Sequence, residues 1–386
     1  MQTIAQSWLV IELTNSEAAV GLVTTLQFLP ITFLVLFGGV VADRMPKRNL
    51  ILAARVLAMS QAFLLATLVS SGHIELWHVY GLALVLGLAN AFEQPARQAF
   101  VVELVGRDDL MNAVALNSGN FNAARLIGPS VAGLVIAGAG VEAAFLLNAL
   151  SFVPSILLLT TMDLSELHIT SRRSGASVGA LSELREGIAY VLKTPAALLI
   201  IILMAFVGTF GFNFIVVVPL LAKFVLDGGS VELGFLTAAI GLGALFSALM
   251  IAGNRRASRF MLFAGGACFA LLLGAVALSE SYSVTLILLM FVGAANIVFA
   301  TTANTSLQLA TPDHLRGRVM ALFMLLVAGS TPIGASFTGL VAGQFGVQTA
   351  VALLSVLCLV GVGAGFLYYL THKAQIESTS EAARYA

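Results

Sequence analysis

Long apolar segments recur along this chain of 386 residues, and they limit its fold more than any other feature. Most run for about 20 to 25 residues, enough to cross a hydrocarbon core about 30 Å thick as an α-helix. Only 10% of the residues are charged, whereas a soluble domain carries about 25%. A transmembrane β-barrel would need alternating strands of about ten residues, and these runs are too long and continuous for that. The sequence therefore predicts an all-α membrane protein.

The pattern predicts twelve transmembrane helices in two six-helix bundles. The predicted spans are 1–14, 18–42, 49–71, 76–97, 110–137, 142–162, 196–222, 231–252, 258–279, 283–309, 318–342 and 347–371. The predicted domains are an N-terminal six-helix bundle over 1–162, a cytoplasmic linker over 163–194, a C-terminal six-helix bundle over 195–372 and a cytoplasmic tail over 373–386. The linker is polar and includes a short amphipathic helix near 181–192. The first span is too short for a full crossing, so we expect the first helix to be truncated and an upstream segment to be missing.

An internal repeat supports the division into halves. Residues 133–141 resemble residues 339–347, and the same offset aligns Gly128 with Gly334. Self-similarity at a fixed offset indicates repeated structure. Two halves with parallel topology suit a transporter in which one half rocks against the other around a central site.

Basic residues predict the orientation. Lys and Arg gather in every second loop, and short loops rich in them stay in the cytoplasm. We therefore expect a multi-pass protein of the cell inner membrane with both termini in the cytoplasm. The net charge is zero, which suggests no nucleic-acid partner. Cys268 and Cys358 lie inside apolar runs and are interpreted as core residues, not as a disulfide or a metal site.

The segment between the second and third spans carries a recognisable pattern. It runs from Gly39 through Asp43 to Arg48 and includes two further basic residues, Arg44 and Lys47. It resembles the cytoplasmic-loop motif of the major facilitator superfamily. The resemblance implies a conformational latch in which Asp43 meets a helix of the other half and the basic residues add ion pairs and contacts with anionic lipid. The alternative is a basic loop that only sets topology.

The fifth span contains Gly128, Pro129 and Gly133. This sequence resembles the Gly-Pro motif of the antiporter branch of that superfamily. Gly permits close helix contact, and Pro removes a backbone donor so that the helix can bend. The alternative is ordinary helix packing. Three further stretches, 1–10, 90–103 and 117–125, resemble the transmembrane secretion effector group, which includes the enterobactin exporter. This resemblance extends over almost the whole chain.

Polar residues inside the spans are the candidates for the substrate cavity. Arg125 is the most informative, because a charge at that depth is costly unless it faces a cavity or a partner. The helical period places Asn117, Phe121 and Arg125 on one face; the alternative is an Arg held by carbonyl groups or a carboxylate. The other candidates are Gln6, Gln27, Asn90, Phe210, Asn213 and Asn296, and the Phe residues suit a bulky amphipathic substrate.

Glu93 and Asp43 are the candidates for proton coupling. Glu93 lies four residues before Arg97, the favourable order for an ion pair on a helix. A carboxylate in low dielectric has a raised pKa, and a nearby Arg lowers it again. Proton affinity that changes with conformation is one interpretation of this pair; a structural ion pair is the other.

These features together predict a secondary transporter and not an enzyme. We expect proton-coupled efflux of small amphipathic molecules, such as a drug or a siderophore, by alternating access. The predicted protein acts as a monomer in lipid and needs no cofactor beyond the proton gradient. The sequence lacks a nucleotide-binding Gly-x-x-x-x-Gly-Lys-Ser/Thr motif. The alternatives are an importer driven by protons or a solute on the same fold, and a membrane scaffold that does not transport.

Overall fold

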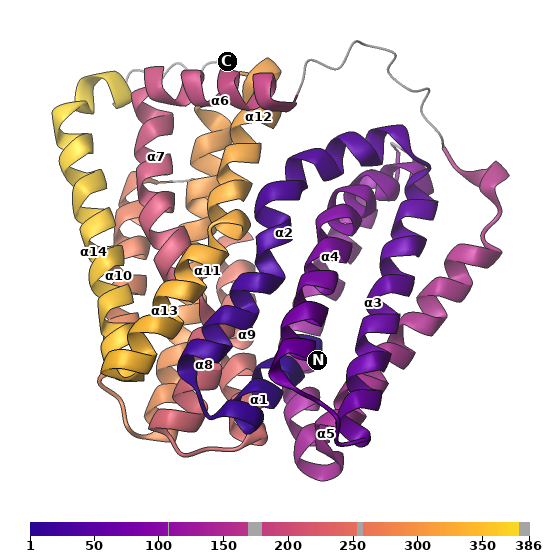
Figure 1. Ribbon diagram of the computed structural model, residues 1–386. Helices are drawn as coiled ribbons and strands as arrows, with labels where there is room; N and C mark the ends of the chain where they lie inside the picture. Colours follow the sequence, from indigo (N-terminus) through magenta and orange to yellow (C-terminus); the bar gives the residue numbers. More distant parts are fainter. Residues whose placement is uncertain (107, 169–179, 253–257, 378–386) are drawn as a thin grey trace. The chain divides into compact units, whose positions relative to one another are not determined.

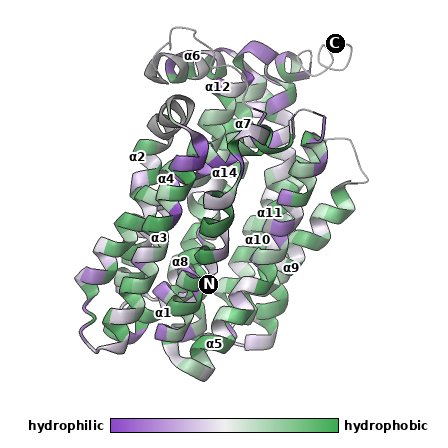
Figure 2. Ribbon diagram, turned by 90° about the vertical axis from the view of Figure 1, so that its right-hand side faces the viewer, coloured by the Kyte–Doolittle hydropathy of each residue, from purple (hydrophilic) through white to green (hydrophobic). Residues whose placement is uncertain are grey.

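A computed structural model describes residues 1–106, 108–168, 180–252 and 258–377. The side chains of residues 35–44, 118, 121, 166, 180, 181, 183 and 252 lie outside that description. Within these ranges every regular segment is helical, and ten segments are long and apolar enough to cross a membrane. Figure 2 shows hydrophobic residues over most of the length of the long helices. The all-α membrane fold is confirmed, whereas the count of twelve spans stays a prediction.

The chain forms two compact units. Unit 1 contains Met1–Ser177 and Gly228–Ala238, and unit 2 contains Val178–Asp227 and Ala239–Ala386. The helices of unit 1 are α1 (Gln2–Thr14), α2 (Glu17–Arg44), α3 (Lys47–Ser70), α4 (Leu76–Val105), α5 (Leu110–Thr161) and the short η1 (Leu164–Glu166), joined by the first turns of α9 (Ser230–Ala252). Figure 1 shows α1 to α5 in colours from indigo to magenta.

The longest helix of unit 1, α5, consists of two helices joined at Gly140. It covers 52 residues, and Gly140 inside it has φ 84° and ψ 168°. A positive φ of this kind favours glycine, which has no Cβ. The break lies between the predicted spans 110–137 and 142–162, so the chain turns where the sequence places the boundary.

Helices α2 and α4 approach closely at Gly87. A Cβ at this position would collide with the backbone carbonyl oxygen of Gln27 and touch the ring of Pro30. Small residues at such contacts let helix backbones approach each other in a membrane. Unit 1 therefore has a tight α2–α4 contact beside which α3 and α5 pack.

Unit 2 contains helices interrupted by π turns. Its elements are α6 (Ala180–Lys193), α7 (Pro195–Phe206), η2 (Val207–Gly211), α8 (Phe214–Leu220), η3 (Leu221–Val225), the rest of α9, α10 (Arg259–Ala277), α11 (Tyr282–Leu309), α12 (Asp313–Met324), η4 (Leu325–Gly329), α13 (Thr331–Phe345) and α14 (Val347–Thr371). The π turns η2, η3 and η4 interrupt the predicted spans 196–222 and 318–342. Each π turn bonds residue i to i+5 and shifts the helical phase.

The amphipathic helix predicted near 181–192 is α6, and it packs on unit 2. It lies across the ends of α7 and α12 (Figure 1). Glu186 forms an ion pair with Arg318 of α12, and the hydroxyl of Tyr190 donates to the carbonyl oxygen of Ala310 at 2.5 Å. Val191 is buried. These contacts fix the segment before α7 to the ends of the neighbouring helices.

Candidate functional site

A charged cluster lies inside the membrane-spanning helices of unit 1. Arg55 of α3 places its Nε 3.3 Å from Oε1 of Glu93 of α4. The same guanidinium donates through Nη1 to the hydroxyl of Ser155 of α5. The side chains of Arg55 and Glu93 are 24% and 16% exposed. Charges within membrane spans are costly and commonly mark ion or substrate pathways, so this charged cluster is the leading candidate site.

The partner of Glu93 differs from the prediction. The favourable spacing on α4 indicated Arg97, but Arg97 is exposed and Glu93 pairs with Arg55. A residue of another helix reaches Glu93, which the spacing rule for a single helix does not consider. Arg55 was missed because it lies close to the cytoplasmic end of its predicted span, where a basic residue is expected on topological grounds.

The described basic residues of the cytoplasmic loop bind within unit 1. Nζ of Lys47 lies 2.6 Å from Oε1 of Glu103 of α4. Arg48 donates to the carbonyl oxygens of Leu159 and Thr160, the latter at 2.9 Å. These carbonyls lie in the last turn of α5, where helix carbonyl groups lack intrahelical partners. Lys47 and Arg48 thus join the adjacent ends of three helices.

The remaining residues of the predicted latch are only partly described. Gly39, Asp43 and Arg44 belong to α2, which runs without interruption to Arg44. Their side chains lie outside the described residues. The role of Asp43 in a latch and in proton coupling therefore stays a prediction.

Four amide side chains form a second polar group in unit 1, which we call the amide cluster: Gln2, Gln6, Gln61 and Asn148. Nδ2 of Asn148 donates to Oε1 of Gln2 at 2.9 Å. Nε2 of Gln2 donates to Oε1 of Gln61 at 3.1 Å. These bonds link α5, α1 and α3 in that order. Gln6 is 2% exposed and lies one turn from Gln2 on the same face of α1.

The Gly-Pro motif of α5 contacts the first turns of α9. A Cβ at Gly133 would collide with the carbonyl oxygen of Ser230, whose hydroxyl donates to the carbonyl oxygen of Gly133 at 3.2 Å. A Cβ at Gly234 would lie 2.8 Å from the carbonyl oxygen of Pro129. A Cβ at Gly128, in contrast, would have no heavy atom within 4 Å. Gly133, more than Gly128, permits this close contact.

The predicted polar face of α5 lies open in the structure. Asn117 and Arg125 are both exposed, and the side chain of Phe121 lies outside the described residues. In the described part of the chain, no carboxylate forms an ion pair with Arg125. The alternative in which a carboxylate fixes this Arg therefore finds no support among those residues.

Two predicted cavity residues of unit 1 lie at the close α2–α4 contact. Gln27 is buried in α2, and its carbonyl oxygen faces Gly87. Asn90 is half-buried in α4, three residues after Gly87 and on a similar side of the helix. The structure thus brings Gln27 and Asn90 to the contact between α2 and α4, whereas Arg125 belongs to a different helix, α5.

In unit 2 the predicted residue Asn213 lies where the helix is broken. It follows η2 and precedes α8, is 3% exposed, and donates through Nδ2 to the carbonyl oxygen of Thr209 at 2.6 Å. A Cβ at Gly334 of α13 would collide with that same carbonyl oxygen. Asn213 therefore satisfies a backbone acceptor at a π turn. Asn296, the other predicted amide, is buried in α11.

The aromatic residues of the predicted seventh span point to different helices. Phe210 packs edge-on against Phe337 of α13, with ring centroids 5.6 Å apart. Phe214 packs against Phe269 of α10 at 6.2 Å. Phe210 belongs to the π turn η2, and Phe212 and Asn213 interrupt the helix before Phe214, so the two rings do not share one helix face.

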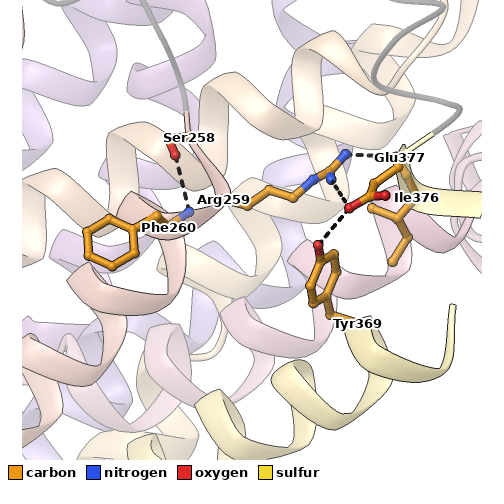
Figure 3. A network of polar contacts seen from close by, with 6 residues as sticks. All are labelled: Ser258, Arg259, Phe260, Tyr369, Ile376 and Glu377. Atoms are coloured by element: carbon orange, nitrogen blue, oxygen red, sulfur yellow. Dashed lines mark hydrogen bonds and ion pairs between the residues drawn. The ribbon is translucent and has the colours of Figure 1, made fainter. Parts of the chain in front are cut away.

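A polar network at one end of unit 2 joins α10 to the segment after α14 (Figure 3). Arg259 pairs with Glu377 at 3.5 Å and donates to the carbonyl oxygen of Ile376 at 3.0 Å. The hydroxyl of Tyr369 donates to Glu377 at 3.0 Å, and the guanidinium of Arg259 lies 5.8 Å from the centre of the Tyr369 ring. The predicted tail from residue 373 therefore begins with a segment bound to α10.

Comparison with known proteins identifies the family. The family model described as "Transmembrane secretion effector" matches residues 1–385. The chain belongs to the transmembrane secretion effector family. This membership, within the major facilitator superfamily, makes the chain a membrane transporter and not an enzyme.

Relatives of this family member include three bacterial transporters. The multidrug efflux pump Tap of Mycolicibacterium fortuitum is 26% identical over 94% of this chain and 90% of its own. The staphyloferrin A transporter of Staphylococcus aureus is 23% identical over 97% and 93%. The enterobactin exporter EntS of Shigella flexneri is 28% identical over 91% and 83%.

Solved structures confirm the transporter fold of this family member. A bacterial homologue of the human lysosomal transporter Spinster, in an inward-facing and occupied conformation, has a TM-score of 0.74 at 13% identity and covers 97% of this chain and 93% of its own. The nucleoside transporter NupG has a TM-score of 0.71 at 13% identity, with 95% and 94% covered. At this level of identity the likeness concerns the fold alone.

Proposed function

We propose that this transporter exports small amphipathic molecules in exchange for protons, with Glu93 as the group that carries the proton. The observation that carries the proposal is the ion pair between Glu93 and Arg55 inside the spans of unit 1. A carboxylate there can change its proton affinity when its distance to a guanidinium changes.

The transport cycle depends on two protonation states. When Glu93 is ionised, it pairs with Arg55 and holds α4 against α3. When a proton from the periplasm neutralises Glu93, the pair loses its attraction and α4 is released from α3. A ligand shifts a conformational equilibrium only through different affinities for the two states, so proton and substrate must favour opposite cavity orientations.

Export, as opposed to import, rests on the motif of α5 and on the relatives. Gly128, Pro129 and Gly133 resemble the antiporter motif, and Gly133 makes a close contact with α9. One relative is named a multidrug efflux pump and another an enterobactin exporter. These names support a drug or a siderophore as the substrate class. The candidates for contact with it are the exposed face of Asn117 and Arg125 together with Gln27, Asn90, Phe210, Asn213 and Asn296.

We place the protein in the cell inner membrane as a monomer, with both termini in the cytoplasm. The distribution of Lys and Arg over alternate loops supports this orientation. The basic residues at the cytoplasmic ends then face anionic lipid, which attracts such groups.

Inverted membrane vesicles test the proposal. Vesicles that contain the full chain should accumulate ethidium or enterobactin when their lumen is made acidic, because the lumen corresponds to the periplasm. Glu93→Gln, which cannot ionise, should remove the dependence on the pH gradient. Glu280→Gln changes an exposed carboxylate outside the helices and should leave that dependence intact.

Three results would refute proton-coupled export. Accumulation that ignores an imposed pH gradient in the unsubstituted protein would exclude antiport. Uptake by intact cells, with none by inverted vesicles, would favour an importer. If neither direction of transport is seen with reconstituted protein, a scaffold that does not transport becomes the better interpretation.

A further inference from the structure

The amide cluster contains three buried polar atoms without a protein partner. Among the residues that the structure describes, only Nε2 and Oε1 of Gln6 and Nε2 of Gln61 are buried side-chain nitrogen or oxygen atoms that lack a hydrogen bond. Gln6 lies one helical turn after Gln2 on α1, and Gln2 is bonded to Gln61 of α3. Among the described residues, all three atoms of this kind therefore belong to the amide cluster of unit 1.

This concentration is energetically unfavourable unless something fills it. A buried amide without a partner bears the full cost of its lost hydration. Within the hydrocarbon region no bulk water is present to replace that partner. Ala5 precedes Gln6 in the chain, and Leu65 and Ala144 lie one helical turn from Gln61 and Asn148; all three are buried and apolar, so their side chains offer no hydrogen-bonding atoms. The missing partner must be a small guest or another conformation of the chain.

One hydroxyl group has enough hydrogen-bonding capacity to give each of the three unmet atoms one bond. Nε2 of Gln6 and Nε2 of Gln61 are donors, whereas Oε1 of Gln6 is an acceptor. A hydroxyl oxygen accepts two hydrogen bonds and its proton forms one. The amide cluster itself contains no charged residue, so an ionised guest would have no counter-charge there. A neutral hydroxyl is therefore the best complement.

We infer that Gln6, together with Gln61, which Gln2 binds, holds a hydroxyl group inside unit 1. The group belongs either to a water molecule or to the transported molecule. Buried waters in proteins typically form about three hydrogen bonds to otherwise unsatisfied polar groups. Binding of a hydroxyl at these atoms does not require proton coupling, so it can hold even where the proposed antiport fails.

The position of the cluster gives the guest a functional consequence. Asn148 of the amide cluster and Ser155 of the charged cluster lie seven residues apart on α5, which is about two helical turns and about 10 Å along the same face. A water molecule at the amide cluster would therefore lie on the side of α5 that leads to Arg55 and Glu93. It would bring a proton donor and acceptor to within two turns of that ion pair.

Thermal unfolding of the purified full chain in lipid nanodiscs tests this site. Gln6→Met keeps an unbranched side chain of similar length and removes both amide atoms. Gln98→Met, at an exposed position of α4, is the matched control. If the amides bind water, Gln6→Met should lower the unfolding midpoint by about 2 °C or more while the shift caused by added enterobactin stays unchanged.

If the amides bind the substrate instead, the midpoint without enterobactin should not fall, and the shift caused by enterobactin should be lost in Gln6→Met. A midpoint that rises or stays constant, with no loss of an enterobactin shift, would overturn the proposal, because removal of unpaired amide atoms is stabilising. If Gln6→Met does not fold, nuclear magnetic resonance of the unsubstituted protein decides. Cross-relaxation to the Gln6 amide protons from water or enterobactin hydroxyls supports the site, and absence of both overturns it.

Discussion

The guanidinium of Arg55 binds Glu93 and Ser155 at the same time, so one side chain of α3 contacts both α4 and α5. Glu93 lies 38 residues and Ser155 lies 100 residues away from Arg55 along the chain. Because both charged side chains are less than a quarter exposed, this contact has consequences for stability as well as for transport.

Removing one partner of this ion pair should destabilise the protein more than removing both. Glu93→Gln leaves the half-buried Arg55 without a counter-charge, which costs about 3 kcal/mol in fully buried pairs and less where water penetrates. Arg55→Gln combined with Glu93→Gln should recover part of that loss, with a coupling energy of about 1 kcal/mol. Unfolding midpoints in nanodiscs of the unsubstituted protein, the two single variants Arg55→Gln and Glu93→Gln, and the double variant measure this coupling. Additive changes would show that the pair contributes nothing.

Asp313→Asn is the control for the charge pair. Asp313 pairs with Arg316 at 2.7 Å, but its side chain is 89% exposed. Exposed ion pairs contribute about 0 to 1 kcal/mol, so this substitution should leave the unfolding midpoint almost unchanged.

Arg48→Lys should destabilise unit 1 although it keeps the charge. Arg48 donates to two successive carbonyl oxygens at the end of α5, and the point charge of Lys cannot reproduce the planar arrangement of donors. We expect a loss of about 1 to 2 kcal/mol, measured by denaturant or thermal unfolding. Arg97→Lys, at an exposed position, should have no comparable effect. A stable Arg48→Lys protein with impaired transport would instead point to a contact made only during the cycle.

Gly133→Ala should impair the protein far more than Gly128→Ala. A methyl group at Gly133 would collide with the backbone of Ser230, whereas a methyl group at Gly128 meets open space. In a helix interior Ala is about 1 kcal/mol more favourable than Gly, so Gly128→Ala should be neutral or stabilising. Vesicle transport and the unfolding midpoint both check the difference. If Gly128→Ala abolishes transport without loss of stability, the close α5–α9 contact is not the basis of the motif.

Ile376→Ala should cost more stability than Glu377→Gln. Ile376 is 2% exposed, and truncation of a buried Ile costs about 2 kcal/mol or more. Glu377 is 44% exposed, and its ion pair with Arg259 should contribute at most about 1 kcal/mol. Thermal unfolding of both variants provides the comparison. The reverse order would show that the polar network, and not the buried Ile, holds this segment on α10.

Much of the fold could be predicted because lipid imposes local requirements. A long apolar run shows in the sequence wherever it occurs, and the break at Gly140 follows from a turn between two such runs. The amphipathic helix α6 could also be predicted, because its pattern of polar and apolar residues lies within one short stretch of sequence. The residue pairs of the site are a different matter, since Glu93 finds its partner on another helix and the spacing on α4 favoured Arg97.

Helical periodicity also failed at particular places. Phe210 and Phe214 would share one face of an uninterrupted α-helix, but Phe210 lies in η2 and the helix is broken at Phe212 and Asn213. Neither the π turns nor the three unpaired atoms of the amide cluster have a local sequence pattern. Gln6 was a candidate for its polarity alone, and the connection from Gln2 to Gln61 and Asn148 needed the tertiary structure.

The π turn η4 changes the rotation of one copy of the internal repeat about its helix axis relative to the other copy. Gly334 corresponds to Gly128 in the repeat, and η4 ends five residues before Gly334, whereas the matching part of α5 contains no such turn. One extra residue in a turn rotates everything upstream by about 100° relative to everything downstream. If mutations in one half are chosen by adding the 206-residue offset to positions in the other half, they will therefore lie on equivalent helix faces only after η4 in the sequence. The two halves therefore differ in which side chains face a given side of the helix, even at positions where their amino-acid sequences are still alike.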